Sequence, residues 1–156
     1  MTRRYKTALF AGSFDPFTAG HLRIVERALT VFDRVIVAVG RNIRKPCPEA
    51  DMNERLKSIE RAVSSLNFPG EEPRVTVTLY SGLTATFARE TGADALLRGV
   101  RSVTDFEYER NLADVNLKLL GMDTYFLLAE PEYSFISSSV ARELMANGHD
   151  ISGIIP

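Results

Sequence analysis

The chain has 156 residues, of which 45% are hydrophobic and 25% are charged, and its net charge is -1. This composition excludes a disordered chain, and the length suits a single domain with one core over residues 1–156. Nucleic-acid binders are usually basic overall, so the charge balance argues against a nucleic acid as partner.

The N-terminal region and the apolar runs predict neither secretion nor a membrane span. Arg3 and Arg4 resemble the basic start of a signal peptide, but the apolar stretch that follows, Thr7–Ala11, is too short to complete one. The longest apolar runs, such as Val35–Val39, are far too short to cross a bilayer. The single cysteine, Cys47, lies between two prolines, and we interpret it as a loop thiol without chemistry. The sequence therefore predicts a cytoplasmic protein with no membrane partner.

Five short runs of apolar or β-branched residues alternate with helical patterns. The predicted strands are Thr7–Ala11, Val35–Val39, Val75–Tyr80, Ala95–Leu97 and Tyr125–Ala129. Apolar residues recur at helical spacing between them, at Leu22, Val25, Leu29 and Phe32 and again at Leu56, Ile59, Ala62, Val63 and Leu66. This alternation predicts an α/β fold: a Rossmann-like, doubly wound five-stranded parallel sheet with helices on both faces.

Turn and capping residues predict where the helices begin and end. Capping-box patterns start at Asp51 and Thr104, Ser137–Ser139 offer a third cap, and Gly92 and Gly148 are typical helix stops. In a sheet of this kind, ligands bind beyond the carboxyl ends of the strands. We therefore expect the functional residues directly after strands.

The first such segment, residues 12–21, reads GSFDPFTAGH and contains neither GxGxxG nor a Walker A pattern. It offers a glycine turn, a hydroxyl and a histidine, His21, at the start of a helix, where unpaired N–H groups attract anions. A lone histidine is more often a surface or core residue, and we interpret His149 as a loop residue. The position of His21, between a strand and a helix, favours a phosphate contact.

Basic or hydroxyl-rich segments follow three other strands. They are Gly40–Lys45, Arg98–Arg101 and Tyr133–Ser139. Solvated charges and a simple helix cap would explain each segment alone, but their convergence on one sheet edge predicts a phosphate site. No hydrolytic triad or acidic metal cluster is evident. Phosphate-binding groups without a nucleophile favour direct in-line phosphoryl or nucleotidyl transfer.

Together, the GxFDPxTxGH segment, the RGVR segment with the DFEYE sequence after it, and the ISSS segment resemble the phosphopantetheine adenylyltransferase family. The similarity runs from the first strand to the end of the chain. The resemblance implies transfer of AMP from ATP to 4′-phosphopantetheine, giving dephospho-coenzyme A and pyrophosphate. It also implies Mg²⁺ carried on the triphosphate and a homohexamer. Family members usually carry one more C-terminal helix, so we expect this helix to be missing from the sequence.

The resemblance also implies roles for individual residues. His21, Lys45 and Arg98 would be catalytic, with His21 stabilising the transition state at the α-phosphate. Ser13, Lys45, Thr84 and Arg98 would bind the acceptor, and Arg44 remains an alternative to Lys45. The residues that would line the ATP site are Ser13, Phe14, His21, Gly99, Val100, Arg101, Glu109, Tyr133, Ser134, Phe135, Ile136, Ser137, Ser138 and Ser139.

Two other interpretations remain open. The first is another enzyme of the same superfamily, such as a nicotinamide or nicotinate mononucleotide adenylyltransferase or a cytidylyltransferase. The second is a non-catalytic nucleotide-binding regulator, which would have no reason to keep His21, Lys45 and Arg98 together.

Overall fold

The structure, a computed structural model, describes residues 6–156, so Arg3 and Arg4 lie outside the described residues. Five parallel strands form one sheet in the order β3-β2-β1-β4-β5. The strands are β1 Thr7–Gly12, β2 Arg34–Gly40, β3 Val75–Tyr80, β4 Ala95–Val100 and β5 Asp123–Leu128. The helices are α1 Ala19–Ala28, α2 Glu49–Val63, α3 Thr84–Glu90, α4 Val103–Leu120 and α5 Ser138–Ala146, with a short 3-10 turn at Ser64–Leu66. The predicted doubly wound sheet is confirmed.

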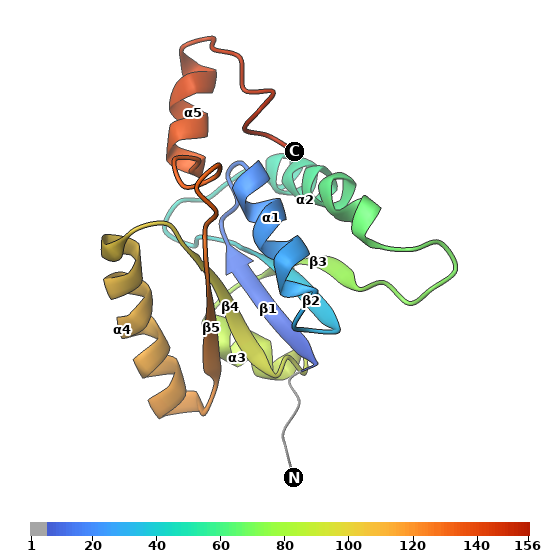
Figure 1. The fold of residues 1–156 in the computed structure, drawn as a ribbon, viewed down its shortest axis with the longest axis vertical. Helices are drawn as coiled ribbons and strands as arrows, with labels where there is room; N and C mark the ends of the chain where they lie inside the picture. Colours follow the sequence, from blue (N-terminus) through green and yellow to red (C-terminus); the bar gives the residue numbers. More distant parts are fainter. Residues whose placement is uncertain (1–5) are drawn as a thin grey trace.

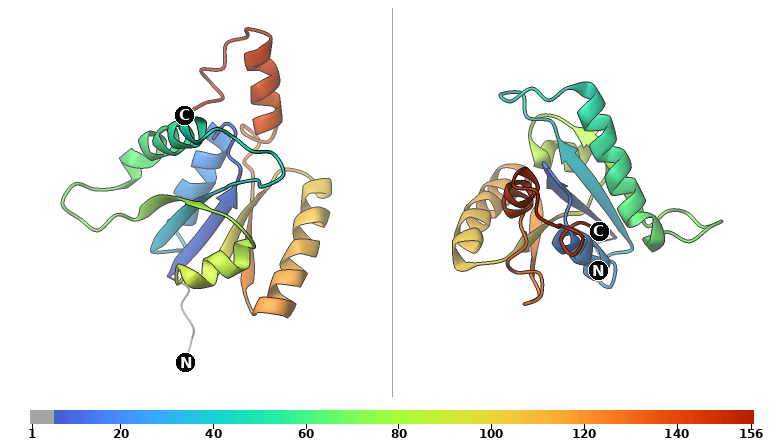
Figure 2. Two further views of the ribbon diagram at one scale, coloured as in Figure 1. Left: turned by 180° about the vertical axis from the view of Figure 1, so that it is seen from behind. Right: turned by 90° about the horizontal axis from the view of Figure 1, so that it is seen from above.

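Two apolar layers hold the helices on opposite faces of the sheet. On one face, Val25 of α1 and Ile59 of α2 pack against alternate strand residues such as Val37. On the other face, Ala88 of α3 packs against the intervening residues, such as Leu96. In Figure 1, α1 lies in front of the sheet and α3 behind it, and Figure 2 shows the reverse side.

Strand β1 lies at the centre of the sheet, where the strand order reverses. Ala8 pairs with Val35 of β2 on one side and with Ala95 of β4 on the other. The chain first builds outward to β3 and then returns to the other side of β1 for β4 and β5. The carboxyl ends of β1 and β4 therefore form the switch point at which such sheets bind ligands. Helix α5 and the C-terminal segment stand beyond this end of the strands (Figure 1).

Two predicted helix starts are wrong, and three other boundary predictions are confirmed. Helix α2 begins earlier than expected, after Pro48, and no side chain caps it. Ser102, rather than Thr104, caps α4 by accepting a hydrogen bond from the Asp105 N–H. The cap of α4 was misplaced because Ser102 and Thr104 both offer a capping hydroxyl, and Asp51 lies in the first turn of α2, where acidic side chains are also favourable. Ser137 caps α5, and Gly92 and Gly148 follow α3 and α5 with positive φ angles.

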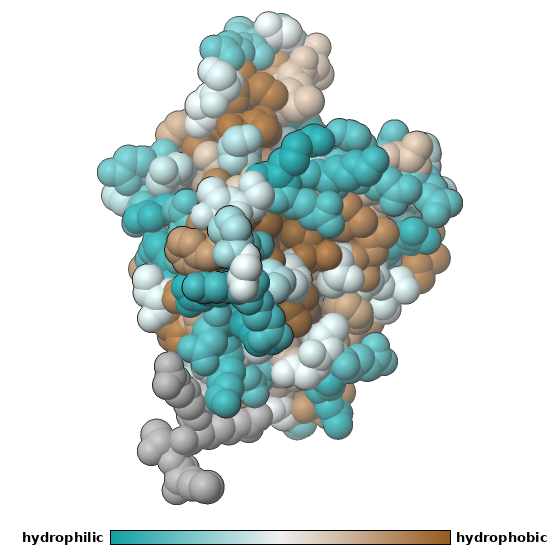
Figure 3. Space-filling model, turned by 90° about the vertical axis from the view of Figure 1, so that its right-hand side faces the viewer, coloured by the Kyte–Doolittle hydropathy of each residue, from teal (hydrophilic) through white to brown (hydrophobic). Residues whose placement is uncertain are grey.

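The surface is mixed in character. Figure 3 shows hydrophilic residues over much of the side that α2 and β3 present, with apolar residues visible between them. Among residues 6–156, no helix combines the length and the apolar character needed to cross a membrane.

Candidate active site

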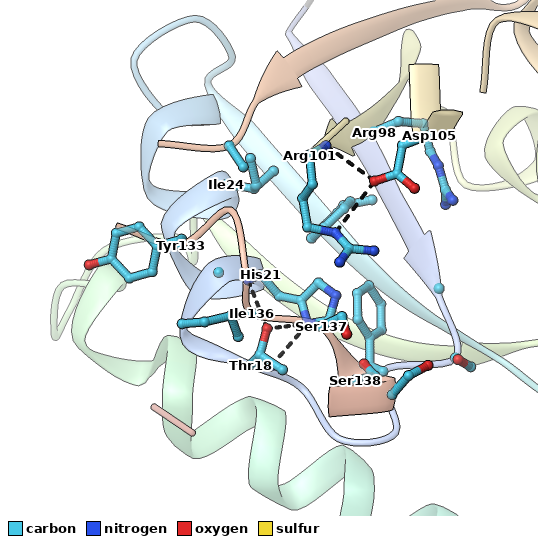
Figure 4. Close-up of a pocket in the computed structure, with 18 of the residues that line it drawn as sticks. Thr18, His21, Ile24, Arg98, Arg101, Asp105, Tyr133, Ile136, Ser137 and Ser138 are labelled. Atoms are coloured by element: carbon cyan, nitrogen blue, oxygen red, sulfur yellow. Dashed lines mark hydrogen bonds and ion pairs between the residues drawn. The ribbon is translucent and has the colours of Figure 1, made fainter. Parts of the chain in front are cut away.

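A cavity of about 290 Å³ opens at the carboxyl ends of β1 and β4. Its walls come from the turn after β1, the start of α1, the end of β4, α4 and the segment that leads into α5 (Figure 4). A Cβ atom at Gly99 would lie 3.2 Å from the Ile24 side chain, so glycine lets β4 and α1 approach closely here. Most of the residues predicted for the ATP site line this cavity: Ser13, Phe14, His21, Gly99, Arg101, Glu109, Tyr133, Ile136, Ser137, Ser138 and Ser139.

Some predicted residues lie elsewhere in the described part of the chain. Val100, Ser134 and Phe135 are close in sequence to lining residues but do not line the cavity themselves. Val100 is buried in the sheet, whereas 65% of Phe135 is exposed. Thr84 lines a second, adjoining cavity, and Lys45 lies in the exposed loop between β2 and α2. The cavity therefore brings together most of the predicted nucleotide residues but only some of the predicted acceptor residues.

The hydrogen bonds of His21 define how its ring can act. Its Nδ1 accepts a hydrogen bond of 2.9 Å from the Thr18 N–H, while the Thr18 Oγ1 accepts one of 3.3 Å from the His21 N–H. Together these bonds form the capping box of α1 (Figure 4). Because Nδ1 is an acceptor, the proton of the neutral ring resides on Nε2. The Nε2–H is thus the group that remains for a ligand.

His21 stays neutral well below its ordinary titration range. Burial, together with the smaller effects of the positive charges of Arg101 and Arg98, lowers the pKa of His21 to about 4. The ring of Phe14 lies edge-on to the imidazole at a centroid distance of 5.1 Å, and that of Phe17 lies at 5.4 Å. A neutral Nε2–H donor held in this way can stabilise charge that develops on a phosphate oxygen.

Arg98 lies at the end of β4 with its guanidinium group held by neighbours. Its Nε and one terminal nitrogen donate to the two carboxylate oxygens of Glu109 at 2.8 and 2.6 Å, and the other terminal nitrogen donates to the Ala11 carbonyl. Glu109 is only 8% exposed, so the Arg98–Glu109 ion pair is a fixed part of the cavity wall. These contacts use three of the five guanidinium N–H groups and leave two for a ligand.

Arg101 is paired more loosely. Its Nε lies 3.5 Å from Asp105, which also accepts from the Arg101 backbone N–H at 3.2 Å. Arg101 is exposed, so its side chain has more freedom than that of Arg98. The cavity therefore contains one fixed and one adaptable cation, a combination suited to an anionic ligand.

The turn after β1 places Phe14 in an unusual backbone conformation. Phe14 has a φ of 46°, which is rare for a bulky residue, and only 3% of it is exposed. Within residues 6–156 its backbone N–H has no hydrogen-bond acceptor. A buried N–H without a partner at the cavity wall is available to an anion.

Helix α5 contributes its N-terminus and also braces the turn. Ser137 is its N-cap, and Ser138 and Ser139 form the first turn at the cavity wall. The Ser138 hydroxyl donates to the Pro16 carbonyl at 2.8 Å, which ties α5 to the turn after β1. The unpaired N–H groups of this helix start offer a second anion site at the wall of the same cavity.

The second cavity, of about 190 Å³, lies on the other side of the Arg98–Glu109 pair. Ala11, Arg98 and Glu109 line both cavities. The remaining wall of the second cavity is mostly apolar, although four of its side chains carry a polar group; it consists of Leu9, Thr84, Leu96, Leu97, Tyr108, Leu112, Ala113, Asn116 and Thr124. The Thr124 Oγ1 is buried there without a hydrogen-bond partner in the described residues. This chamber suits a narrow, largely apolar ligand that carries some polar groups.

Sequence reasoning missed two residues that act through others. Thr18 orients His21, and its signal was the spacing of a helix cap with histidine in the third helical position. Asp105, in the first turn of α4, pairs with Arg101, which precedes the Ser102 cap of that helix. Both are visible in the sequence only once the start of each helix is known.

Among residues 6–156, no three His, Cys, Asp or Glu side chains lie close enough together to hold a metal ion. The cavity wall instead carries the two arginines described above.

Sequence comparisons connect this geometry to known proteins. Residues 9–144 match the cytidylyltransferase-like family. The phosphopantetheine adenylyltransferase of Porphyromonas gingivalis is 50% identical over 150 residues, which cover 96% of this chain and 93% of the relative. That of Bacteroides fragilis is 42% identical over 152 residues, with coverage of 97% and 96%.

Solved structures share the fold at lower sequence identity. The bifunctional NMN adenylyltransferase/ADP-ribose pyrophosphatase of Francisella tularensis superposes with a TM-score of 0.62 and 16% identity, over 97% of this chain and 45% of that one. A second structure of that enzyme, in complex with AMP and a manganese ion, superposes with a TM-score of 0.60 and 18% identity, over 97% of this chain and 44% of that one. At this level of identity the likeness establishes the fold alone.

Proposed function

The chain belongs to the phosphopantetheine adenylyltransferase family, and from this premise we propose that it transfers AMP from ATP to 4′-phosphopantetheine in the cytoplasm. The products are dephospho-coenzyme A and pyrophosphate, which places the reaction in coenzyme A biosynthesis. The observation that carries the proposal is the pair of adjoining cavities at the switch point of the sheet, with Arg98 lining both. A two-substrate transfer needs two chambers that meet at the reacting phosphates.

ATP occupies the larger cavity in this proposal. The Nε2–H of His21, the N–H of Phe14 and the start of α5 surround the space for its phosphates, with Arg101 at the rim. Val100, Ser134 and Phe135 support this wall through their neighbours rather than by contact. Glu109 contributes indirectly, since Arg98 engages both of its carboxylate oxygens.

The acceptor occupies the smaller cavity. Its pantetheine arm runs past Thr84 and Asn116, and its phosphate lies at Arg98, which has two free N–H groups for it. Ser13 is exposed at the rim of the ATP cavity, next to Ala11 and Arg98. Lys45 reaches this phosphate from its exposed loop, with Arg44 as the alternative cation.

The chemistry is a direct in-line displacement. An oxygen of the acceptor phosphate attacks the α-phosphorus of ATP, the new P–O bond forms, and the bond to the β-phosphate breaks with its electron pair passing to pyrophosphate. The acceptor phosphate is ionised near neutral pH, with a second pKa of about 6, so no general base is required. His21 donates its Nε2–H to the α-phosphate oxygen on which charge accumulates.

We propose that Mg²⁺ enters as part of the Mg-ATP substrate. Mg²⁺ in phosphoryl-transfer sites is commonly held by substrate phosphates together with one or two carboxylates and water. Within residues 6–156, no cluster of three ligating side chains offers the ion a protein cage of its own.

We further propose a closed homo-oligomer, a hexamer as the family resemblance implies. The 18-residue helix α4 supports an oligomer because Glu109 is its only buried residue, whereas large apolar side chains on one face, such as Tyr108, Val115 and Leu119, are more than half exposed. An apolar helix face of this kind is typical of a surface that another subunit covers. Light scattering at micromolar concentration tests this, and a monomer would contradict it.

The decisive experiment is a substrate panel. The purified protein is mixed with Mg-ATP and either 4′-phosphopantetheine, nicotinate mononucleotide or nicotinamide mononucleotide, and pyrophosphate release is followed. We expect turnover with 4′-phosphopantetheine, and ATP formation when dephospho-coenzyme A and pyrophosphate are supplied. Turnover only with a mononucleotide would contradict the proposal, and ATP binding without any turnover would favour a regulator.

A further inference from the structure

Arg55, a residue of α2 outside the ATP cavity, holds the turn after β1 from behind. One terminal nitrogen donates to the Ser13 carbonyl at 3.0 Å, and the other lies 3.2 Å from the Asp15 carboxylate. The Arg55 side chain is 17% exposed and that of Asp15 is 52% exposed. The ion pair is thus anchored on its arginine side by packing, whereas the ion pair of Arg61 with Glu54 on the same helix is exposed on both sides.

The carbonyl contact fixes a peptide group that faces the substrates. In a planar trans peptide, the Ser13 carbonyl and the Phe14 N–H point in opposite directions. Because Arg55 holds the carbonyl from the α2 side, the Phe14 N–H points away from α2, and within the described residues it has no acceptor. The orientation of this free N–H therefore depends on Arg55.

Arg55 also connects this turn with the second loop of the site. Helix α2 begins at Glu49, directly after the basic loop that contains Lys45. One side chain thus ties the helix that follows the acceptor-binding loop to the turn that faces ATP. A shift between these two parts would misalign the attacking oxygen and the α-phosphorus.

We propose that Arg55 is a positioning residue for the transfer reaction, which orients the Ser13–Phe14 peptide group and keeps α2 in register with it. This inference rests on the proposed adenylyl transfer. Arg55 touches neither substrate and acts through the Ser13 carbonyl and the Asp15 carboxylate.

Arg55→Met tests the role, because methionine keeps much of the packed stem and removes all the donors. We expect kcat to fall by about 10- to 100-fold, as is typical when a reacting group is misplaced by a fraction of an ångström to an ångström. We expect the ATP dissociation constant to rise by less than about threefold, because most ATP contacts remain. Arg55→Lys retains a charged donor and should recover part of the lost kcat.

Arg61→Met is the matched control. It lies on the same helix, and its ion pair with Glu54 is 68% exposed on both sides, so its kcat should equal that of the wild type. Guanidinium ion at millimolar concentration gives an independent readout, since Arg55 also lines an open groove of about 500 Å³ that admits solvent. We expect guanidinium to raise the kcat of Arg55→Met and to leave that of Arg61→Met unchanged, with ammonium chloride as the salt control.

The outcomes separate this inference from the proposed function. If the wild type releases no pyrophosphate with 4′-phosphopantetheine, the proposed function fails, whatever Arg55 does. If the wild type is active and a folded Arg55→Met protein has wild-type kcat, the inference is wrong. The inference is also wrong if ATP affinity and kcat fall by the same factor in Arg55→Met, or if Arg61→Met loses as much activity as Arg55→Met. Should Arg55→Met not fold, as judged by circular dichroism, Asp15→Asn replaces it, and a wild-type kcat in that variant would overturn the inference.

Discussion

The two loops that supply the proposed reacting groups differ in how firmly the protein holds them. In the turn after β1, Phe14, Phe17 and Thr18 are each less than 5% exposed, and side chains from α2 and α5 hold its carbonyl groups. In the loop after β2, by contrast, Arg44 and Lys45 are exposed, and within the described residues their backbone N–H groups bond only to Asn42. The turn after β1 is therefore braced by other helices, whereas Arg44 and Lys45 bond only within their own loop.

This difference predicts how each loop contributes to the reaction. Preorganised donors stabilise the transition state without a cost in reorganisation, so changes in the turn should lower kcat. An exposed side chain loses conformational freedom when it binds a ligand. Substitutions in the loop after β2 should therefore act mainly on acceptor binding, and their effects should be smaller than those of substitutions in the turn.

The largest effect is expected in the rigid turn, at His21. We expect His21→Ala to lower kcat by about 100-fold or more, the usual cost of deleting one preorganised donor at a transition-state oxygen. ATP affinity should fall much less, because the donor acts mainly on developing charge. Steady-state kinetics and calorimetry measure the two quantities, and His149→Ala is the control. Equal losses in kcat and ATP affinity would make His21 a binding residue only.

The pH dependence of stability provides a second test of the burial of His21. The native state keeps His21 neutral down to a pKa of about 4, whereas the unfolded chain takes up its proton near 6.5. Between these values the unfolded state binds more protons, so stability falls as the pH decreases from 6.5 towards 4. His21 should contribute up to about 3 kcal/mol to this fall.

Urea unfolding of the wild type and of His21→Gln across this range measures the contribution, which should be absent in the variant. Nuclear magnetic resonance of a His149→Gln protein, in which His21 is the only histidine, follows the titration directly. A titration midpoint of 6.5 or above in the free protein would contradict the structure.

Arg98 and Lys45 extend the contrast to acceptor binding. Charged hydrogen bonds are worth roughly 1.5–3 kcal/mol, so Arg98→Ala should weaken the binding of 4′-phosphopantetheine by about 10- to 100-fold. Lys45→Ala should weaken the binding of 4′-phosphopantetheine by about 10-fold or less. The size of this effect should depend more on salt concentration, because an exposed charge is screened. Calorimetric titration of each ligand measures both effects, and Arg44→Ala shows which of the two loop cations matters. If both variants bind the acceptor normally but lose ATP, the two half-sites are assigned wrongly.

The sheet and most of the ATP cavity could be predicted because their signals are local. The apolar runs predicted all five strands, since buried parallel strands need apolar side chains on both faces. The fourth strand was predicted to end at Leu97, yet it continues to Val100. The charge of Arg98 looked like the end of a strand, but Glu109, eleven residues later, neutralises it within the fold.

The sequence did not reveal the long-range contacts that hold the turn after β1. Arg55 reaches Ser13 across 42 residues, and Ser138, itself a predicted site residue, reaches Pro16 across 122. No spacing rule indicates such pairs, because their distance in the sequence is unrelated to their distance in space. The sequence therefore indicated His21 as a candidate site residue, but it gave no sign of the contacts from α2 and α5 that hold the turn in place.

The smallest expected effect concerns Thr18, which holds His21 from two atoms. Its backbone N–H donates to Nδ1, and its hydroxyl oxygen accepts from the His21 N–H and lies 3.0 Å from the same Nδ1. Thr18→Val keeps the backbone bond and the shape of the side chain but removes the hydroxyl, so it should cost about 1 kcal/mol of stability as a lost helix cap. Because the backbone bond still fixes the tautomer of His21, kcat should fall by less than about tenfold. Thr18→Ser, which retains the hydroxyl, serves as the control, and urea unfolding with steady-state kinetics measures both quantities. A loss in Thr18→Val as large as that in His21→Ala would mean that the hydroxyl, and not the backbone, orients the imidazole.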